Sequence, residues 1–161
     1  MSPKPSDSPP LIIDLPDTAA TDRFGAALAD GLAGGDAILM QGVVGAGKSH
    51  LSRAIIRALT SPGQEVPSPT YTLVQEYETA RGTMWHMDLY RLGSVEELAE
   101  LGIDFEDDTV MHLIEWPERL GAERPRRCLE IALEIVGVGR RATLRPYGDG
   151  WDWTRKAVPN D

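Results

Sequence analysis

The stretch GVVGAGKSH, residues 42 to 50, decides the fold of this chain. It fits the pattern G-x-x-x-x-G-K-[ST], in which Gly47, Lys48 and Ser49 form the end of the motif. Glycines let the backbone bend with its N–H groups turned inward, at dihedral angles that a Cβ atom would forbid. Those N–H groups, with the positive end of a following helix, suit a phosphate group. The pattern therefore predicts a phosphate-binding loop.

The flanking sequence favours this interpretation over an ordinary glycine-rich turn. AILMQ, residues 37 to 41, is a continuous apolar run typical of a strand buried on both faces, and residues 48 to 59 have the spacing of an amphipathic helix. We expect ATP or ADP with Mg²⁺ here, with Lys48 on the β- and γ-phosphates and the Ser49 hydroxyl as a metal ligand. The residues expected around the phosphates are Val44, Gly45, Ala46, Gly47, Lys48, Ser49 and His50.

The rest of the chain predicts an α/β fold. A strand at 11–15 leads into a helix at 18–33, capped by Asp17 or Thr18 and stopped by Gly34-Gly35. The later elements are a hairpin of strands 72–78 and 83–88, a helix at 94–101 with a capping box of Ser94 and Glu97, a strand at 110–116, and a hairpin of strands 128–136 and 140–146. We expect one P-loop NTPase-like domain over residues 11–147, with a mainly parallel sheet and antiparallel hairpin additions. A disordered N-terminal tail, residues 1–10, and a C-terminal tail, residues 148–161, would flank it.

Composition narrows the function classes. The chain has 161 residues, 42% of them hydrophobic, and a net charge of −9. An acidic surface repels nucleic-acid backbones, although arginines between 119 and 145 leave a contact with an acidic partner open. No apolar run approaches the roughly 20 residues that cross a bilayer, and the N-terminus does not resemble a secretory signal. The single cysteine, Cys128, lies in an apolar run and is interpreted as a core residue. These features favour a cytoplasmic protein without a membrane partner.

Two acidic residues end predicted strands, Asp88 after TMWHM and Glu115 after VMHLI. Ligands of α/β sheets gather at the carboxyl ends of parallel strands, so we expect both carboxylates beside the phosphate loop. One could hold Mg²⁺ and the other could act on the attacking water, and residue patterns alone leave that assignment open. His86 and His112 lack partners at metal-ligand spacing, which argues against a zinc site. Trp116 is equally consistent with packing and with function.

With these residues in place, the chain resembles the TsaE family, small P-loop ATPases of bacterial threonylcarbamoyladenosine synthesis. Four segments carry the resemblance in order, from about residue 15 to 145: GVVGAGKSH, SPTYTLVQEY at 68–77, HMDLYRL at 86–92 followed by EELAELGI, and LIEWPE at 113–118. The resemblance implies ATP hydrolysis in partnership with TsaB and TsaD, which attach a threonylcarbamoyl group to adenosine 37 of tRNA. Hydrolysis would reset that complex, and this chain would meet tRNA only through it.

The resemblance also implies residue roles. Lys48, Asp88 and Glu115 would be catalytic, and Ser49, Asp88 and Glu115 would surround the metal. Thr70, Tyr71 and Trp116 match a switch-like loop and an invariant tryptophan. Thr18 and Gly139 match segments that flank the base and sugar.

Two positions depart from the family pattern, and two other functions stay open. Val43 replaces a usual aspartate and His50 a usual threonine, so we expect His50 to meet the α-phosphate through its N–H or imidazole. The alternatives are a small P-loop kinase that phosphorylates a small molecule or nucleotide, with arginines 119–127 as a lid, and a nucleotide sensor without catalysis.

Overall fold

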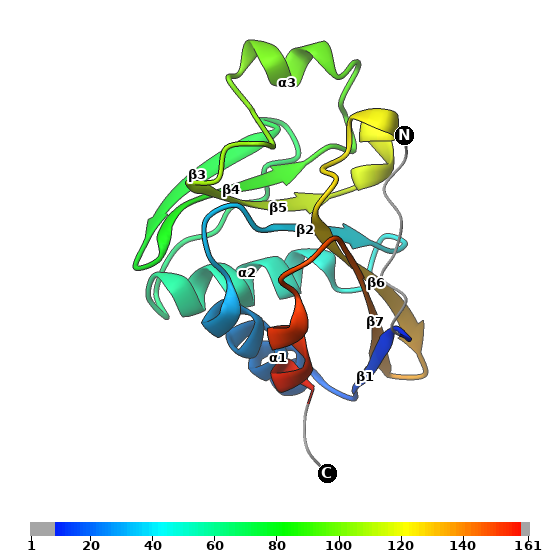
Figure 1. The fold of residues 1–161 in the computed structure, drawn as a ribbon. Coiled ribbons are helices and arrows are strands. Elements are labelled where there is room, and N and C mark those ends of the chain that lie inside the picture. The colour runs from blue at the N-terminus through cyan, green and yellow to red at the C-terminus, as the bar shows by residue number, and fades with distance from the viewer. Residues whose placement is uncertain (1–8, 159–161) are drawn as a thin grey trace.

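A computed structural model describes residues 9–158, which form one seven-stranded sheet with helices on both faces (Figure 1). The strands are β1 (Leu11–Leu15), β2 (Ala37–Gln41), β3 (Val74–Thr79), β4 (Gly82–Asp88), β5 (Val110–Glu115), β6 (Cys128–Val136) and β7 (Gly139–Tyr147). The helices are α1 (Thr18–Gly31), α2 (Lys48–Leu59), α3 (Glu96–Glu100) and the 3₁₀ helices η1 (Pro117–Glu123) and η2 (Asp152–Ala157). The predicted disordered N-terminal tail falls almost wholly outside the described residues.

The strand order is β1-β7-β6-β2-β5-β4-β3. The four inner strands β6, β2, β5 and β4 run parallel, while β1, β7 and β3 pair antiparallel with their neighbours. The predicted fold class, a mainly parallel sheet with antiparallel hairpin additions, is confirmed. This arrangement brings the carboxyl ends of β2, β4 and β5 to one edge, which is where a ligand of such a sheet binds.

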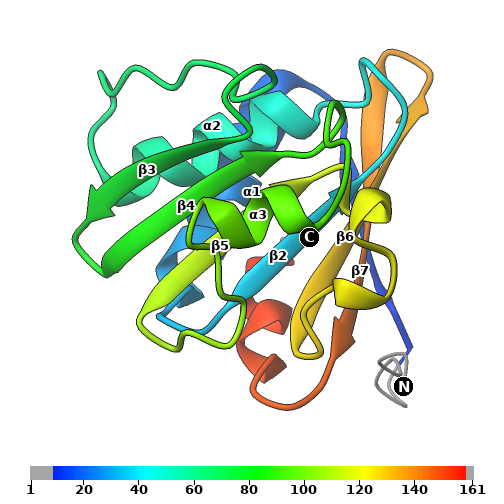
Figure 2. The ribbon, with the colours of Figure 1, turned by 90° about the horizontal axis from the view of Figure 1, so that it is seen from above.

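Successive side chains of each strand point to opposite faces of the sheet, so the hydrophobic core has one part on each face. Ile38 and Met40 of β2 pack with α1 and α2, whereas Leu39 packs on the opposite face with Leu98 of α3 and Leu120 of η1. Figures 1 and 2 show the same layers, with α1, α2 and η2 on one side of the sheet and α3 and η1 on the other. Strand β2 is therefore buried on both faces, as its continuous apolar run predicts.

Several element boundaries differ from the predictions for local reasons. Helix α1 is capped by Asp17, whose Oδ1 accepts a hydrogen bond from the Ala20 N–H at 2.8 Å. It ends two residues early, because Leu32 turns extended and the Ala33 N–H donates to Asp36. The strand predicted from residue 72 begins at Val74, because Leu73 has a left-handed backbone (φ 68°).

The ends of two later segments also differ. The capping box predicted from Ser94 and Glu97 does not form, because the Glu97 carboxylate accepts from the Gly93 N–H and α3 begins only at Glu96. The segment assigned to a C-terminal tail is partly built into the fold. Trp151 is only 3% exposed, and η2 packs on α1. The six residues of η2 are too few to show the periodicity from which a helix is predicted.

Candidate functional site

The loop between β2 and α2 has the backbone that its glycines allow. Gly42 has φ 148°, and a Cβ atom there would lie 2.6 Å from the Leu133 carbonyl oxygen. Gly47 has φ 105° and directly precedes α2, so the N–H groups of the first helical turn open toward the loop. A side chain at either position would strain or block the loop. Helix α2, which has 12 residues, directs the positive end of its dipole at this loop.

Lys48, the first residue of α2, is folded back onto the loop. Its ammonium group donates hydrogen bonds to the carbonyls of Gly42 and Val43 and lies 4.0 Å from the centre of the Trp116 ring. Burial lowers the pKa of Lys48, and the carboxylates of Glu115, Glu118 and Asp88 act in the opposite direction. The lysine therefore lies beside an aromatic face and within the electrostatic influence of three carboxylates.

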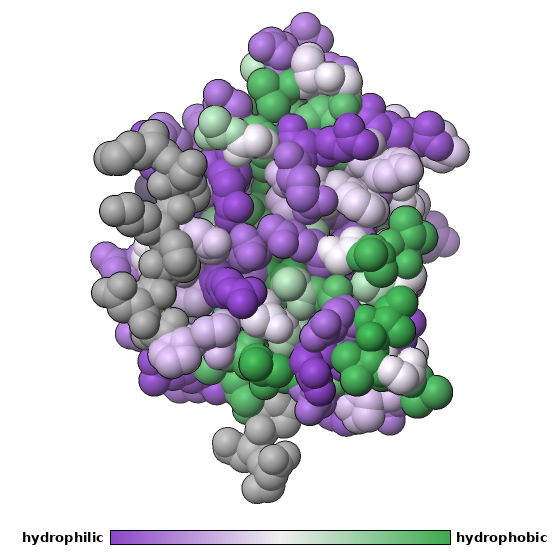
Figure 3. Space-filling view, turned by 90° about the vertical axis from the view of Figure 1, so that its right-hand side faces the viewer, coloured by the Kyte–Doolittle hydropathy of each residue, from purple (hydrophilic) through white to green (hydrophobic). Residues whose placement is uncertain are grey.

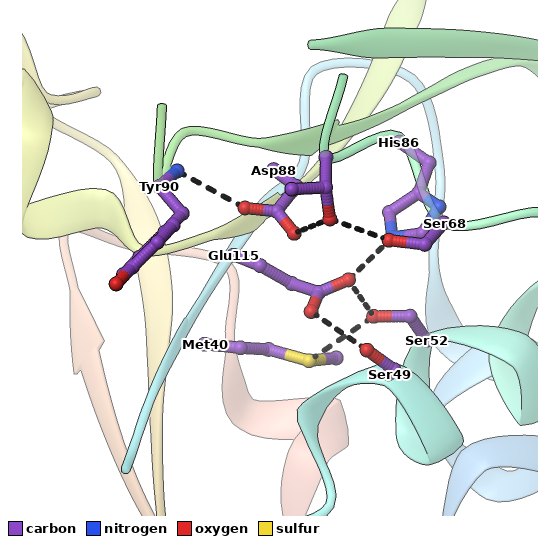
Figure 4. Close-up of polar contacts among 9 residues, drawn as sticks. Met40, Ser49, Ser52, Ser68, His86, Asp88, Tyr90 and Glu115 are labelled. Atoms are coloured by element: carbon purple, nitrogen blue, oxygen red, sulfur yellow. Dashed lines mark hydrogen bonds and ion pairs between the residues drawn. The ribbon is translucent and has the colours of Figure 1, made fainter. Parts of the chain in front are cut away.

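Glu115 ends β5 and points at the start of α2 (Figure 4). Its Oε1 accepts from the Ser49 hydroxyl at 3.3 Å. Its Oε2 lies 2.6 Å from His86 Nε2 and accepts from the Ser52 hydroxyl at 3.3 Å. One carboxylate oxygen is therefore held inside the protein, while the other faces the hydroxyl that ends the phosphate-loop motif.

Asp88 ends β4 and stands beside Glu115, because the two residues are paired across the parallel strands. Its Oδ1 accepts from the Tyr90 N–H at 3.0 Å and its Oδ2 accepts from the Thr70 hydroxyl at 2.9 Å. Thr70 in turn shares a 2.7 Å hydrogen bond with Ser68. The predicted proximity of both carboxylates to the loop is what the structure shows, and Asp88 additionally ties the segment 68–70 to the site.

A pocket of about 550 Å³ covers these groups. Its lining includes every loop residue from Val44 to His50 and the predicted residues Thr18, Thr70, Asp88, Glu115, Trp116 and Gly139. Helix α1 forms one wall with Thr18, and the β6–β7 hairpin forms another with Gly139 and Val138. Residues from six separate parts of the chain therefore converge on one cavity, which is large enough for a small-molecule ligand.

The side chains of two predicted site residues contact other elements. The His50 imidazole lies 2.8 Å from Asp22 of α1, so this side chain links the two helices, while His50 still lines the pocket and its contact with phosphate stays a prediction. Tyr71 is 82% exposed and does not line the pocket; the Arg91 guanidinium lies 4.5 Å from its ring centre. Nothing in the sequence pattern distinguishes these orientations, because both depend on partners from other elements.

Aliphatic side chains are exposed at the end of the sheet where the phosphate loop and the β6–β7 turn lie. Val43 and Val44 of the loop and Ile135, Val136 and Val138 of the hairpin are all exposed large hydrophobic residues. Figure 3 shows apolar side chains gathered at one edge of the side of the molecule formed by this hairpin, beside a mainly hydrophilic surface. Exposed apolar groups that cluster beside a pocket are typical of a protein contact.

Sequence reasoning missed three participants. His86 and Ser52 hold Glu115, and Tyr90 positions Asp88 through its N–H and packs on Trp116 with ring centres 5.1 Å apart. A signal existed for two of them. His86 precedes Asp88 by two residues on one strand and therefore shares its face, and Ser52 follows Ser49 by one helical turn.

The site residues fit a magnesium ion bound with a nucleotide. Within residues 9–158 no three His, Cys, Asp or Glu side chains are grouped to hold a metal by themselves. Mg²⁺ instead takes a few hard oxygen ligands and completes its shell with water and phosphate oxygens. The Ser49 hydroxyl and the Glu115 carboxylate, 3.3 Å apart at the helix start, are a donor pair of that kind.

A mixed sheet whose central parallel strand leads through a glycine-rich loop into a helix starting with Lys-Ser defines this protein as P-loop NTPase-like. The family model described as "Threonylcarbamoyl adenosine biosynthesis protein TsaE" matches residues 15–142. The chain belongs to the TsaE family, and the resemblance drawn from its sequence is confirmed. No helix of the described residues is long and apolar enough to cross a membrane.

Individual relatives agree with the family. The chain is 36% identical over 121 residues to the tRNA threonylcarbamoyladenosine biosynthesis protein TsaE of Rickettsia felis, a match that covers 75% of this chain and 71% of the relative. It is 43% identical over 112 residues to the protein of the same name from Synechocystis, covering 66% and 69%. The crystal structure of YdiB from Bacillus subtilis superposes with a TM-score of 0.74 over 96% of this chain and 95% of YdiB, at 22% identity, which shows the same fold.

Proposed function

We propose that this protein is the Mg²⁺-dependent ATPase of tRNA threonylcarbamoyladenosine biosynthesis, acting in the cytoplasm with TsaB and TsaD. The observation that carries the proposal is the convergence of Lys48, Ser49 and Glu115 at the phosphate loop of a TsaE-family chain. Asp88 at the adjoining strand end supplies the second carboxylate. These are the parts that phosphoryl transfer to water requires: a phosphate cradle, a metal site and a group that orients the nucleophile.

Each side chain has a distinct task in this proposal. The loop N–H groups and Lys48 bind the β- and γ-phosphates, and Thr18 and Gly139 border the base and sugar. Magnesium, when bound, neutralises charge on the phosphates beside Ser49 and Glu115. Asp88 orients the attacking water, because its two oxygens are fixed by Tyr90 and Thr70 and it faces the same pocket. The proposal therefore places Glu115 on the metal side and Asp88 on the side of the attacking water.

The acidic chain is proposed to reach tRNA only through its partners. A net charge of −9 disfavours direct contact with a phosphate backbone. The exposed aliphatic side chains beside the pocket suit a protein partner that covers the nucleotide and excludes water. We therefore expect slow ATP hydrolysis by the isolated chain and faster hydrolysis in the complex.

Reconstitution tests the function directly. Phosphate release is measured for this protein alone, for TsaB with TsaD, and for all three, and the tRNA product is analysed for the threonylcarbamoyl group. We expect stimulated hydrolysis and repeated rounds of modification only in the complete mixture. The matched control is the Lys156→Ala variant, which removes an exposed lysine of η2 and should behave as wild type. Hydrolysis and modification that do not respond to this protein would refute the proposal.

Trp116 should report nucleotide binding by its fluorescence. In the structure the centre of its ring lies 4.0 Å from the Lys48 ammonium, and the backbone of Trp116 is left-handed (φ 59°). A bound β-phosphate draws the lysine toward itself, so the cation–π contact weakens and the emission changes. Titration of the wild type with ADP should give a saturable change in tryptophan emission that the Trp116→Phe variant lacks.

A second tryptophan provides the control for this measurement. Trp85 packs against His112 and does not line the pocket. The Trp85→Phe variant should keep the full ADP-dependent change. An undiminished response in Trp116→Phe would show that the lysine and this ring are not coupled during binding.

A further inference from the structure

We infer that His86 is a positioning residue for Glu115: its Nε2 atom holds one carboxylate oxygen so that the other stays directed at Ser49. The inference rests on the proposed function and extends it to a residue outside the phosphate loop and the two strand-end acids. Figure 4 shows the His86 ring on the side of the Glu115 carboxylate that faces away from Ser49.

The sheet geometry places His86 within hydrogen-bond distance of Glu115. His86 and Asp88 lie on one face of β4, and Glu115 faces the same way from β5, where it is paired with Asp88. His86 is therefore the diagonal neighbour of Glu115 and reaches it over a 2.6 Å contact. Both side chains are 2% exposed, so water does not compete for this bond.

The inference assigns the proton of the contact to one nitrogen of His86. A carboxylate that serves Ser49 as an acceptor only accepts hydrogen bonds, so Nε2 is assigned as the donor. His86 Nδ1 is buried and has no hydrogen-bond partner among the described residues. A buried polar atom left without a partner costs stability. An apolar residue would fill the same space without that cost, so packing alone does not account for an imidazole here.

The two oxygens of Glu115 are thereby given different surroundings. Oε2 is held by His86 and by the Ser52 hydroxyl, both buried, while Oε1 meets the Ser49 hydroxyl at the mouth of the phosphate loop. Without the His86 donor, Oε2 keeps only the 3.3 Å bond from Ser52, and the carboxylate is free to rotate. Partners of this kind fix the direction of a ligand or catalytic carboxylate.

A pair of substitutions separates positioning from packing. In glutamine the amide nitrogen is as many bonds from Cβ as Nε2 is in histidine, whereas in asparagine it corresponds to Nδ1. His86→Gln should therefore keep the bond to Glu115 and stay within a few-fold of wild-type kcat in the reconstituted ATPase assay. His86→Asn should lose about 10- to 100-fold in kcat with little change in KM.

Two readouts do not depend on turnover. The ¹⁵N spectrum of the nucleotide-free protein should show a protonated Nε2 and a bare Nδ1 for His86. The increase in ADP affinity on adding Mg²⁺ should survive in His86→Gln and shrink in His86→Asn. These measurements stand even if the chain proves not to hydrolyse ATP, so failure of the proposed function is distinguished from failure of this inference.

His112 supplies the matched control. It is also a buried strand histidine, but it faces the other side of the sheet, against Trp85 and Phe105, and burial lowers its pKa to about 4. His112→Gln and His112→Asn should change thermal stability and leave the Mg²⁺ dependence of ADP binding unaltered. Equal behaviour of His86→Gln and His86→Asn in both kcat and Mg²⁺ dependence, or a protonated Nδ1 on His86, would overturn the inference.

Discussion

The Glu115→Gln variant is expected to hydrolyse ATP about 10²- to 10³-fold more slowly than wild type in the complete TsaB–TsaD mixture. Glutamine keeps the size of the side chain but removes the negative charge that faces Ser49 at 3.3 Å. A neutral amide is a poor partner for a divalent cation, so ADP should bind this variant with the same affinity whether or not Mg²⁺ is present. Isothermal titration with ADP, with Mg²⁺ and with chelator, measures that difference.

The Asp88→Asn variant is the matched comparison. It removes the other strand-end charge, which accepts from Tyr90 and Thr70 rather than from Ser49. If Asp88 orients the attacking water, this variant should lose turnover to a similar degree and keep the Mg²⁺ dependence of ADP binding. The reverse pattern, with Mg²⁺ dependence lost in Asp88→Asn and kept in Glu115→Gln, would contradict the assignment of the metal side to Glu115.

The phosphate loop and its flanking elements could be predicted because their conformation depends mainly on residues close together in the sequence. Residues 37–41 and 48–59 carry the period of a buried strand and of an amphipathic helix, and both ranges agree with the structure. The glycines between them are required by positive φ angles at Gly42 and Gly47. The placement of Asp88 and Glu115 followed from one rule, that parallel strands end at a common edge.

The parts that could not be predicted depend on contacts between elements distant in sequence. Glu115 is held by His86 and Ser52, which are 29 and 63 residues away, and the His50 imidazole is held by Asp22, 28 residues away. A one-dimensional pattern gives the face on which each side chain lies, but the partner depends on strand order. Once β4 is known to lie beside β5, the His86–Glu115 contact follows from the register.

The side chains of the segment 70–73 also depend on contacts from other elements. The structure turns Thr70 to Asp88 and Tyr71 to Arg91, and the role of this segment as a switch-like loop stays a prediction. The left-handed backbone of Leu73 separates this segment from β3 and lets the loop approach the site. Leucine rarely adopts that conformation, so tertiary contacts override the local preference here.

Lys48→Ala should weaken ADP binding about 30- to 150-fold, which corresponds to about 2 to 3 kcal/mol for a lost charge-assisted contact to phosphate. The carboxylates of Glu115, Glu118 and Asp88 act to raise the pKa of Lys48, so its removal also takes away the positive charge that offsets theirs near the phosphates. We expect the loss to be larger for ATP than for ADP, because the lysine reaches the γ-phosphate as well. Equilibrium binding of both nucleotides by calorimetry measures the effect.

A second substitution at the same position separates charge from packing. Lys48→Met keeps an unbranched apolar stem beneath the Trp116 ring but cannot donate to phosphate. Both variants should therefore lose affinity alike, while Lys48→Met unfolds closer to the wild-type temperature than Lys48→Ala. Wild-type affinity in Lys48→Met would mean that the ammonium stays with the Gly42 and Val43 carbonyls when nucleotide binds, and the loop would then hold phosphate by its backbone alone.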